Sequence, residues 1–117
     1  MDVEWLTSPE HHDYGAAESY LSLVTYPWEA QETAAALRDA KESEHPAKDV
    51  LRASGLPLLP EDNAHVAKDL RKIKDGVKLS PVLLVRGPRA LIIADGYHRI
   101  CAAYHVDENA VVRARIV

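Results

Sequence analysis

The chain contains an abrupt corner, where an apolar run ends on the pair Asp95-Gly96 and a helix-like run follows almost at once. Residues 90–94 read Ala-Leu-Ile-Ile-Ala, and residues 100–104 read Ile-Cys-Ala-Ala-Tyr. A strand that turns directly into a helix leaves the first N–H groups of the helix without partners, and the helix dipole makes that end positive. Such an end is a natural seat for phosphate, to which His98 and Arg99 would add charge-assisted donors.

The composition is that of a single globular domain. Its 117 residues suit one core, and 47% of them are apolar. The net charge of −4 argues against a nucleic-acid partner, because contact with a phosphate backbone needs a basic face. One cysteine cannot form an internal disulfide, no run reaches the ~20 apolar residues of a membrane span, and no apolar leader segment follows a basic start. We therefore expect a cytoplasmic protein without a membrane partner.

Helix signals dominate the first half of the chain and recur in the second. Asp13 is expected to cap the first helix, Pro27 suits the first turn of the next, and Asp62 or Asn63 precedes another. Gly55 and Gly76 are suited to helix C-termini. The expected helices span residues 14–24, 28–41, 47–54, 64–74 and 97–106. In the first two, the expected inward residues are Tyr20, Leu21, Val24, Trp28, Ala35 and Leu37.

Strand signals concentrate in the second half. Residues 82–85 and 91–93 are the clearest strands, joined by a hairpin at residues 87–89, and residues 111–117 alternate as a final strand does. Residues 56–60 are extended because they contain two prolines. Residues 41–46 are expected to form an exposed connection. The sequence thus predicts one α+β domain, in which residues 1–55 form a helical cover over a small mixed β-sheet core formed by residues 56–117.

The second half resembles the ParB/sulfiredoxin fold. The similar features are a helix ending at Gly76, Pro81 leading into an apolar strand, the turn from Asp95 to Arg99, and the pair Ala102-Ala103 in the following helix. In ParB-type domains the equivalent turn cradles a nucleoside triphosphate, and in sulfiredoxins a Gly-Cys-His-Arg turn holds nucleotide phosphates and supplies the catalytic cysteine. Gly96, His98 and Arg99 match that second pattern residue by residue. The resemblance therefore implies ATP or another nucleoside triphosphate as the cofactor, and phosphoryl chemistry normally also needs Mg²⁺.

The chain also departs from both patterns. Tyr97 stands where sulfiredoxin has its cysteine, so the resemblance does not imply reduction of a sulfinic acid. Cys101 lies one helical turn further on and is expected to be a small buried hydrophobe. We expect no ParB-type helix-turn-helix after Val117, and His98 replaces the first of two adjacent arginines of the ParB pattern.

We assign the candidate site to the corner. Gly96, Tyr97, His98 and Arg99 are the predicted ligand-binding residues, and His98 and Asp95 are the candidates for acid–base catalysis. Asp95 is most simply the helix N-cap, with a base or a ligand of a metal-bound water as the alternative. Arg99 opposes the helix dipole, a cost that an anion in the turn would explain. Gly96 could equally serve only the tight turn, and Tyr97 could stack on a base or pack at the helix start.

Other polar groups are expected to be ordinary surface. The sets His11-His12-Asp13 and Asp62, His65, Asp69 lack the ligand count of a structural zinc site, so we predict no metal site. Arg113 and Arg115 share a strand face and could extend a basic pocket, and Arg86 and Arg89 flank the hairpin. The N-terminal aromatic residues either pack the helices onto the sheet or form a partner or homodimer surface: Trp5, Tyr14, Tyr20, Tyr26 and Trp28.

Three functions remain open from the sequence. The first is a protein that binds a nucleotide or another phosphorylated small molecule at residues 95–99, with no assigned reaction. The second is a non-catalytic interaction module that keeps the fold. The third and weakest is DNA binding or nuclease activity of the ParB kind, which the acidic balance disfavours.

Overall fold

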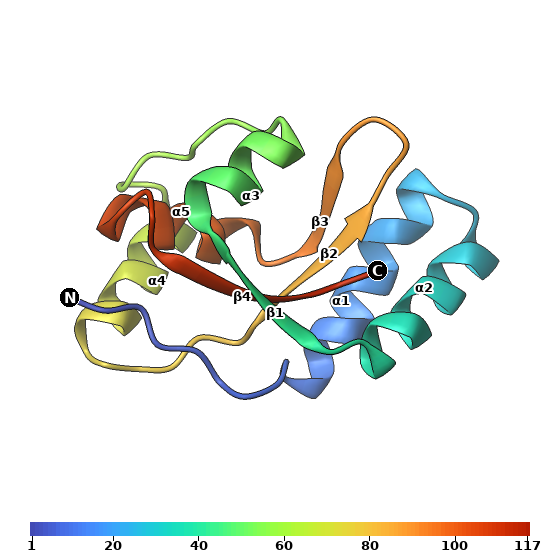
Figure 1. Cartoon of the computed structure of the whole chain (residues 1–117), viewed down its shortest axis with the longest axis horizontal. Helices are drawn as coiled ribbons and strands as arrows, with labels where there is room; N and C mark the ends of the chain where they lie inside the picture. The colour runs from blue at the N-terminus through green and yellow to red at the C-terminus, as the bar shows by residue number, and fades with distance from the viewer.

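The chain forms five helices and four strands, and the computed structural model describes all 117 residues (Figure 1). The helices are α1 (His11–Val24), α2 (Pro27–Asp39), α3 (Ala47–Ser54), α4 (Ala64–Lys74) and α5 (Tyr97–Val106). The strands are β1 (Glu42–Pro46), β2 (Val82–Arg86), β3 (Leu91–Asp95) and β4 (Val111–Ile116). The predicted α+β class is confirmed.

The four strands form one mixed sheet in the order β1-β4-β2-β3. β2 and β3 pair antiparallel through the expected hairpin, and β1 pairs antiparallel with β4. β4 returns beside β2 in parallel, and α5 lies in the connection that brings it back. The corner between β3 and α5 is therefore set at one end of the sheet, at the start of this crossover.

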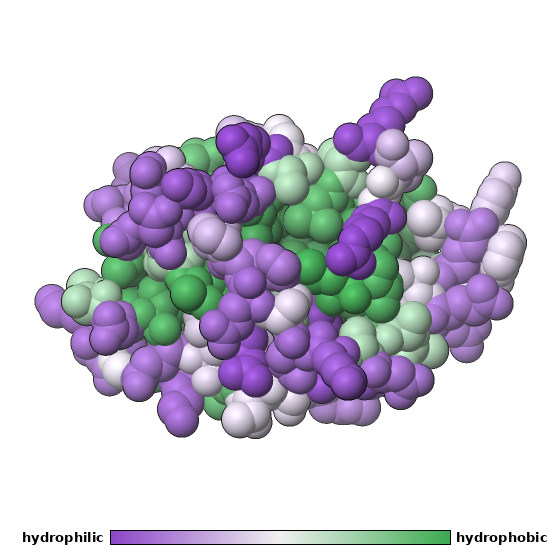
Figure 2. All heavy atoms as spheres, viewed as in Figure 1, coloured by the Kyte–Doolittle hydropathy of each residue, from purple (hydrophilic) through white to green (hydrophobic).

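Alternating side chains of the sheet enter two apolar layers. Val82 and Leu84 belong to a cluster of 15 buried residues that includes side chains of α3, α4 and α5. Leu83 between them belongs to a second cluster of 7, which includes residues of α1 and α2. In Figure 1 the α1–α2 pair lies toward the right and the other three helices toward the left. Figure 2 shows apolar surface beside the C-terminus and the β2–β3 hairpin, where Val85, Ile92 and Val117 are only partly buried.

Residues 42–46 form strand β1, so the expectation of an exposed connection there is wrong. The segment reads Glu-Ser-Glu-His-Pro and carries no local strand signal. It pairs because β4 offers a free edge, and Glu42 lies opposite Arg115, whose Nε and Nη2 groups contact the Glu42 carboxylate at 2.9 and 2.8 Å. Nearby side chains hold the pKa of Glu42 below its usual value although burial acts the other way. Long-range pairing overrides local propensity here.

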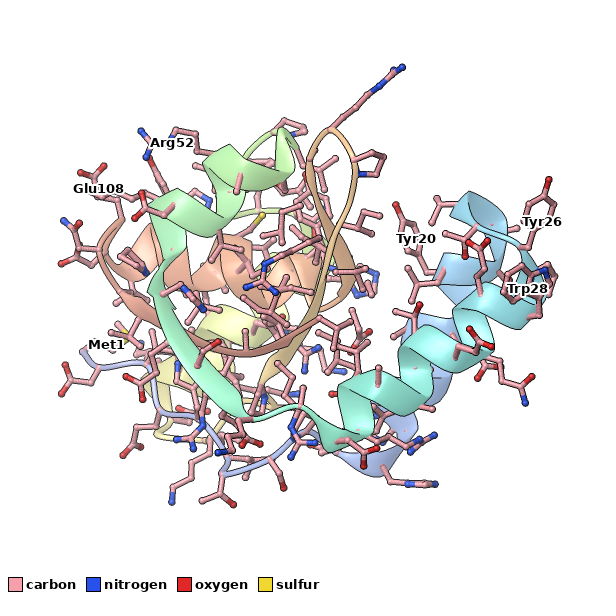
Figure 3. The ribbon with its side chains drawn as sticks, turned by 45° about the vertical axis from the view of Figure 1, so that its right-hand side comes forward. Met1, Tyr20, Tyr26, Trp28, Arg52 and Glu108 are labelled. Carbon is pink, nitrogen blue, oxygen red and sulfur yellow. The ribbon has the colours of Figure 1, made fainter.

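The α1–α2 pair is less buried than its sequence indicates. Leu21 and Leu37 are buried as expected, but Tyr20, Val24, Trp28 and Ala35 are exposed. The free end of the pair extends beyond the sheet, as Figure 3 shows for Tyr20, Tyr26 and Trp28. The apolar side chains that were expected to face inward therefore have nothing to pack against at that end of the pair. None of the five helices combines the length and the apolar character that a membrane crossing requires.

Candidate functional site

The corner between β3 and α5 depends on Gly96. Gly96 has φ 109° and ψ 17°, a left-handed conformation that side chains disfavour, and it is the N-cap of α5. A Cβ atom at this position would lie 2.4 Å from Cγ1 of Val82 on the neighbouring strand. The tight turn and the packing of the strand therefore both require glycine. No side chain caps the first turn of α5, so its amides face the corner without a side-chain acceptor.

Arg99 reaches back across the corner into three hydrogen bonds. Its Nη2 group donates to Oδ2 of Asp95 at 2.7 Å, and Nη1 donates to Oδ2 of Asp13 at 3.1 Å and to the Ser80 carbonyl at 2.9 Å. The Arg99 side chain is only 14% exposed. Its Nε–H group and one Nη2 hydrogen have no partner in the protein, since a guanidinium carries five N–H donors.

This geometry corrects two predictions. Asp95 is not the N-cap of α5, because its carboxylate accepts from the Arg99 side chain and Gly96 occupies the cap position. Asp13 is not the cap of α1, because the helix begins at His11 and Asp13 is buried in its first turn. The two carboxylates supply the negative charge that a cation at a helix N-terminus needs. Arg99 therefore does not by itself require a bound anion, and its contact with phosphate stays a prediction.

Asp13 joins α1 to the segment before β2. The Ser80 hydroxyl donates to Asp13 at 2.5 Å and accepts from the Glu10 amide at 3.0 Å, so both roles of this buried hydroxyl are used within the fold. Nε2 of His12 lies 3.2 Å from Oδ1 of Asp13. Burial raises the pKa of Asp95, with Asp13 adding to the effect and Arg99 opposing it. The cluster thus fixes the N-terminal helix against the corner.

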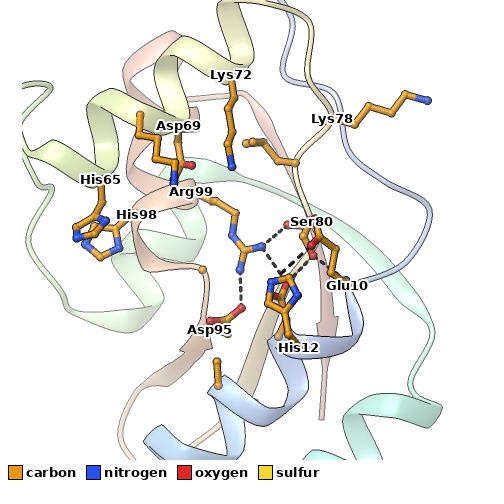
Figure 4. A pocket seen from close by; sticks show the side chains of 15 residues that line it. Glu10, His12, His65, Asp69, Lys72, Lys78, Ser80, Asp95, His98 and Arg99 are labelled. Carbon is orange, nitrogen blue, oxygen red and sulfur yellow. Dashed lines mark hydrogen bonds and ion pairs between the residues drawn. The ribbon is translucent and has the colours of Figure 1, made fainter.

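An open cavity of about 390 Å³ lies at this cluster (Figure 4). Its walls come from the start of α1, one face of α4, residues 78–80 before β2, and the corner itself. Only two of its fifteen lining residues are hydrophobic. Asp95, Gly96, His98 and Arg99 all line it, so the structure brings these predicted site residues together.

One face of α4 brings to the cavity cationic side chains that the sequence did not identify as site residues. Lys68, Lys72 and Lys78 line the cavity, and none of the three forms an ion pair. In Figure 4 Lys72 points from α4 toward Arg99, whereas Lys78 points outward. Asp69 also lines the cavity, and burial raises its pKa although Lys72, Arg99, His98 and Lys68 act to lower it. A partly buried carboxylate therefore lies within a group of cationic side chains.

His98 lies against His65 of α4. The two ring centroids are 4.7 Å apart with an angle of 42° between the planes, and Figure 4 shows the two imidazoles side by side. Burial lowers the pKa of His98, the neighbouring His65 lowers it further, and Asp69 opposes the shift. His98 is therefore held toward its neutral form at pH 7, in which one ring nitrogen donates and the other accepts a hydrogen bond.

Tyr97 is the one predicted ligand residue that does not line the cavity. Its hydroxyl donates to the Pro57 carbonyl, and its ring packs beside the first apolar cluster. Burial raises the pKa of this phenol. Tyr97 therefore packs at the helix start, one of the two interpretations that the sequence allowed, and base stacking by this residue stays a prediction.

The remaining candidates lie elsewhere or are buried. Cys101 is buried as expected, and burial raises the pKa of its thiol. Arg115 contacts Glu42 and the carbonyl groups at the end of α2, not the cavity. No group of three or more histidine, cysteine, aspartate or glutamate side chains is arranged to hold a metal ion. His65 and Asp69, interpreted as solvated surface, do line the cavity, and their spacing of four on one helix was the available signal.

Comparison with known proteins identifies no relative: no family model, no curated protein and no solved structure matches this chain.

Proposed function

We propose that the chain binds a nucleotide or another phosphorylated small molecule in the cavity at the β3–α5 corner. The observation that carries the proposal is one open cavity lined by Lys68 and Lys72, which form no ion pair, by two adjacent histidines and by the uncapped start of α5. Helix amides and lysines are common phosphate donors in proteins. The resemblance of Gly96, His98 and Arg99 to the sulfiredoxin turn leads to the same proposal.

Each residue has a distinct role in this proposal. The amides of His98 and Arg99 and the side chains of Lys68 and Lys72 hold phosphate oxygens. His98 donates to the phosphate or transfers a proton, since a neutral imidazole can do either. A nucleoside triphosphate would bring Mg²⁺, for which Asp95 is the carboxylate nominated from the sequence and Oδ1 is its free oxygen. A phosphorylated ligand of this kind suits the cytoplasmic location expected from the sequence.

A ligand panel tests this function. Thermal shift and calorimetry should show stabilisation by at least one of ATP, CTP or pyrophosphate, measured with and without Mg²⁺. The pKa of His98, measured by NMR titration of its ring resonances, should rise on binding, because a nearby anion favours the imidazolium. The exposed His11 of α1 is the internal control. If no ligand shifts the melting temperature and the His98 titration stays unchanged, the proposed function is wrong.

A second candidate is self-association through the free end of the α1–α2 pair. Apolar and aromatic side chains are exposed there together: Leu23 is 84% exposed, Tyr26 69% and Trp28 59%, and the rings of Tyr26 and Trp28 stack 6.4 Å apart (Figure 3). If this end forms a homodimer, the parent chain should have twice the monomer mass by light scattering, and Leu23→Glu should restore the monomer. A monomeric parent chain removes this candidate.

A further inference from the structure

Almost all of the residues that line the cavity are polar or charged. Its only hydrophobic lining residues are Ala16 and Leu79, and Leu79 is 2% exposed. Pockets that bind drug-sized organic groups are lined mostly by apolar and aromatic side chains, which compensate for the water that such groups lose. A nucleobase placed in this cavity would therefore gain little from burial.

The cavity also lacks a free aromatic platform. Tyr97, at the start of α5, is engaged with the Pro57 carbonyl outside the cavity. The rings of His65 and His98 lie against each other, with centroids 4.7 Å apart and a tilt of 42°, so they do not form an open flat surface for a base. Stacking on aromatic side chains is the main sequence-independent source of affinity for bases, and here no tyrosine, tryptophan or phenylalanine lines the cavity.

Beside the carboxylates of Glu10, Asp13, Asp69 and Asp95, the cavity offers lysine side chains that form no ion pair. Lys68 and Lys72 lie on one face of α4 within one helical turn, and Lys78 lies across the cavity before β2. None of these lysines is neutralised by an ion pair, whereas Arg99 is bound by two carboxylates. Binding in such a site depends on the number and spacing of negative charges in the ligand, and it weakens as salt screens them.

From this lining we infer that the ligand is a compact polyanion without a nucleobase, of the polyphosphate or multiply phosphorylated small-molecule class. This inference rests on the proposed phosphate-binding function and narrows it. Lys68 and Lys72 are the residues that contact successive phosphate groups, and the start of α5 holds the terminal one.

Calorimetry with tripolyphosphate, ATP and adenosine at low ionic strength tests this inference. Tripolyphosphate should bind within about threefold of ATP, and adenosine should give no heat of binding, because the base contributes little affinity. If ATP binds at least about tenfold more tightly than tripolyphosphate, or if adenosine binds, the cavity recognises a nucleoside. That result overturns this inference and leaves the proposed function standing. If none of the three ligands binds, the proposed function fails as well.

A pair of double variants separates this cavity from general surface attraction. Lys68→Gln/Lys72→Gln should lower the affinity for tripolyphosphate at least about tenfold. Lys41→Gln/Lys48→Gln removes the same charge from exposed lysines outside the cavity and should change the affinity less than about twofold. Equal losses in the two variants would show that the polyanion binds the surface at large, which also overturns the inference. A thermal melt of each variant confirms that it is folded.

Discussion

The corner and one face of α4 both place cationic side chains at the same cavity. The cation at the corner is largely buried and paired, whereas the cations on α4 are exposed and unpaired. Arg99 at the corner is 14% exposed and is bound by Asp13, Asp95 and the Ser80 carbonyl. The lysines of α4 are exposed and unpaired. A charge taken out of water must be paired, whereas a solvated charge needs no partner. The buried cation therefore stabilises the fold, and the solvated cations stay free for a ligand.

Replacing Arg99 should give the largest effect. Arg99→Met leaves Asp13 and Asp95 without their cation and removes the ion pair that joins α1 to the corner. We expect the free energy of unfolding to fall by about 3 kcal/mol, because loss of one partner leaves a buried charge unpaired. Urea denaturation measures the change, and Arg89→Met on the exposed hairpin is the matched control. Equal stability of the two variants would show that Arg99 is not structural, and the contrast with α4 would disappear.

Substitution of Gly96 tests whether the corner itself is rigid. Gly96→Ala places a Cβ 2.4 Å from Val82 in a left-handed backbone, and we expect a loss of about 2–3 kcal/mol in unfolding free energy. The double variant Gly96→Ala/Val82→Ala removes the close contact and should show a positive coupling energy relative to the two single variants. Gly15→Ala is the control, because open space surrounds Gly15 in the middle of α1. That change should stabilise the protein by about 0.5–1 kcal/mol. Additive losses in the double variant would show that the steric contact is absent.

The contrast between the two regions also explains what the sequence could predict. The corner was recognisable because its chemistry is local: an apolar strand, a glycine with positive φ and a helix follow one another in the chain. Gly55, with φ 70° at the end of α3, and Asn63, which accepts from the His65 and Val66 amides, were predictable for the same reason. Turns and caps depend on neighbouring residues.

The partners of Arg99 were not predictable in this way. Asp13 lies 86 positions before Arg99, and its distance from the corner is fixed only once α1 packs on the sheet. Strand β1 likewise exists because β4 has a free edge, and its polar sequence gives no sign of pairing. The positions of His65, Lys68 and Lys72 place them on one side of α4, but the sequence does not show that this side borders a cavity. Tertiary packing decides each of these features.

The pH dependence of the unfolding free energy tests whether the fold keeps His98 toward its neutral form. We expect a smaller effect than that of Arg99→Met or Gly96→Ala. Burial and His65 lower the pKa of His98 below its usual 6.5, with Asp69 opposing the shift. The unfolded chain therefore takes up this proton more readily, so the unfolding free energy should fall as the pH drops through 6.5 toward the folded pKa. His98→Asn should flatten this decline between pH 7.5 and 5.5, whereas His11→Asn should not. Urea denaturation across the range measures both, and an unchanged slope in His98→Asn would mean that His98 titrates as freely in the folded state as in the unfolded chain.

The smallest expected effect on stability comes from the exposed lysines of α4. Lys68→Gln/Lys72→Gln should change the free energy of unfolding by no more than about 0.5 kcal/mol in the absence of ligand, because exposed residues without partners contribute little to stability. The one opposing influence is Asp69, whose carboxylate is favoured in its charged form by both lysines. Replacing Asp69 with Asn in the same background therefore shows whether any loss comes from that carboxylate. If the lysine double variant is destabilised by more than about 1 kcal/mol and Asp69→Asn restores it, α4 holds its charges as the corner does. The lysines would then be structural partners of Asp69, and they could not be counted as free for a ligand.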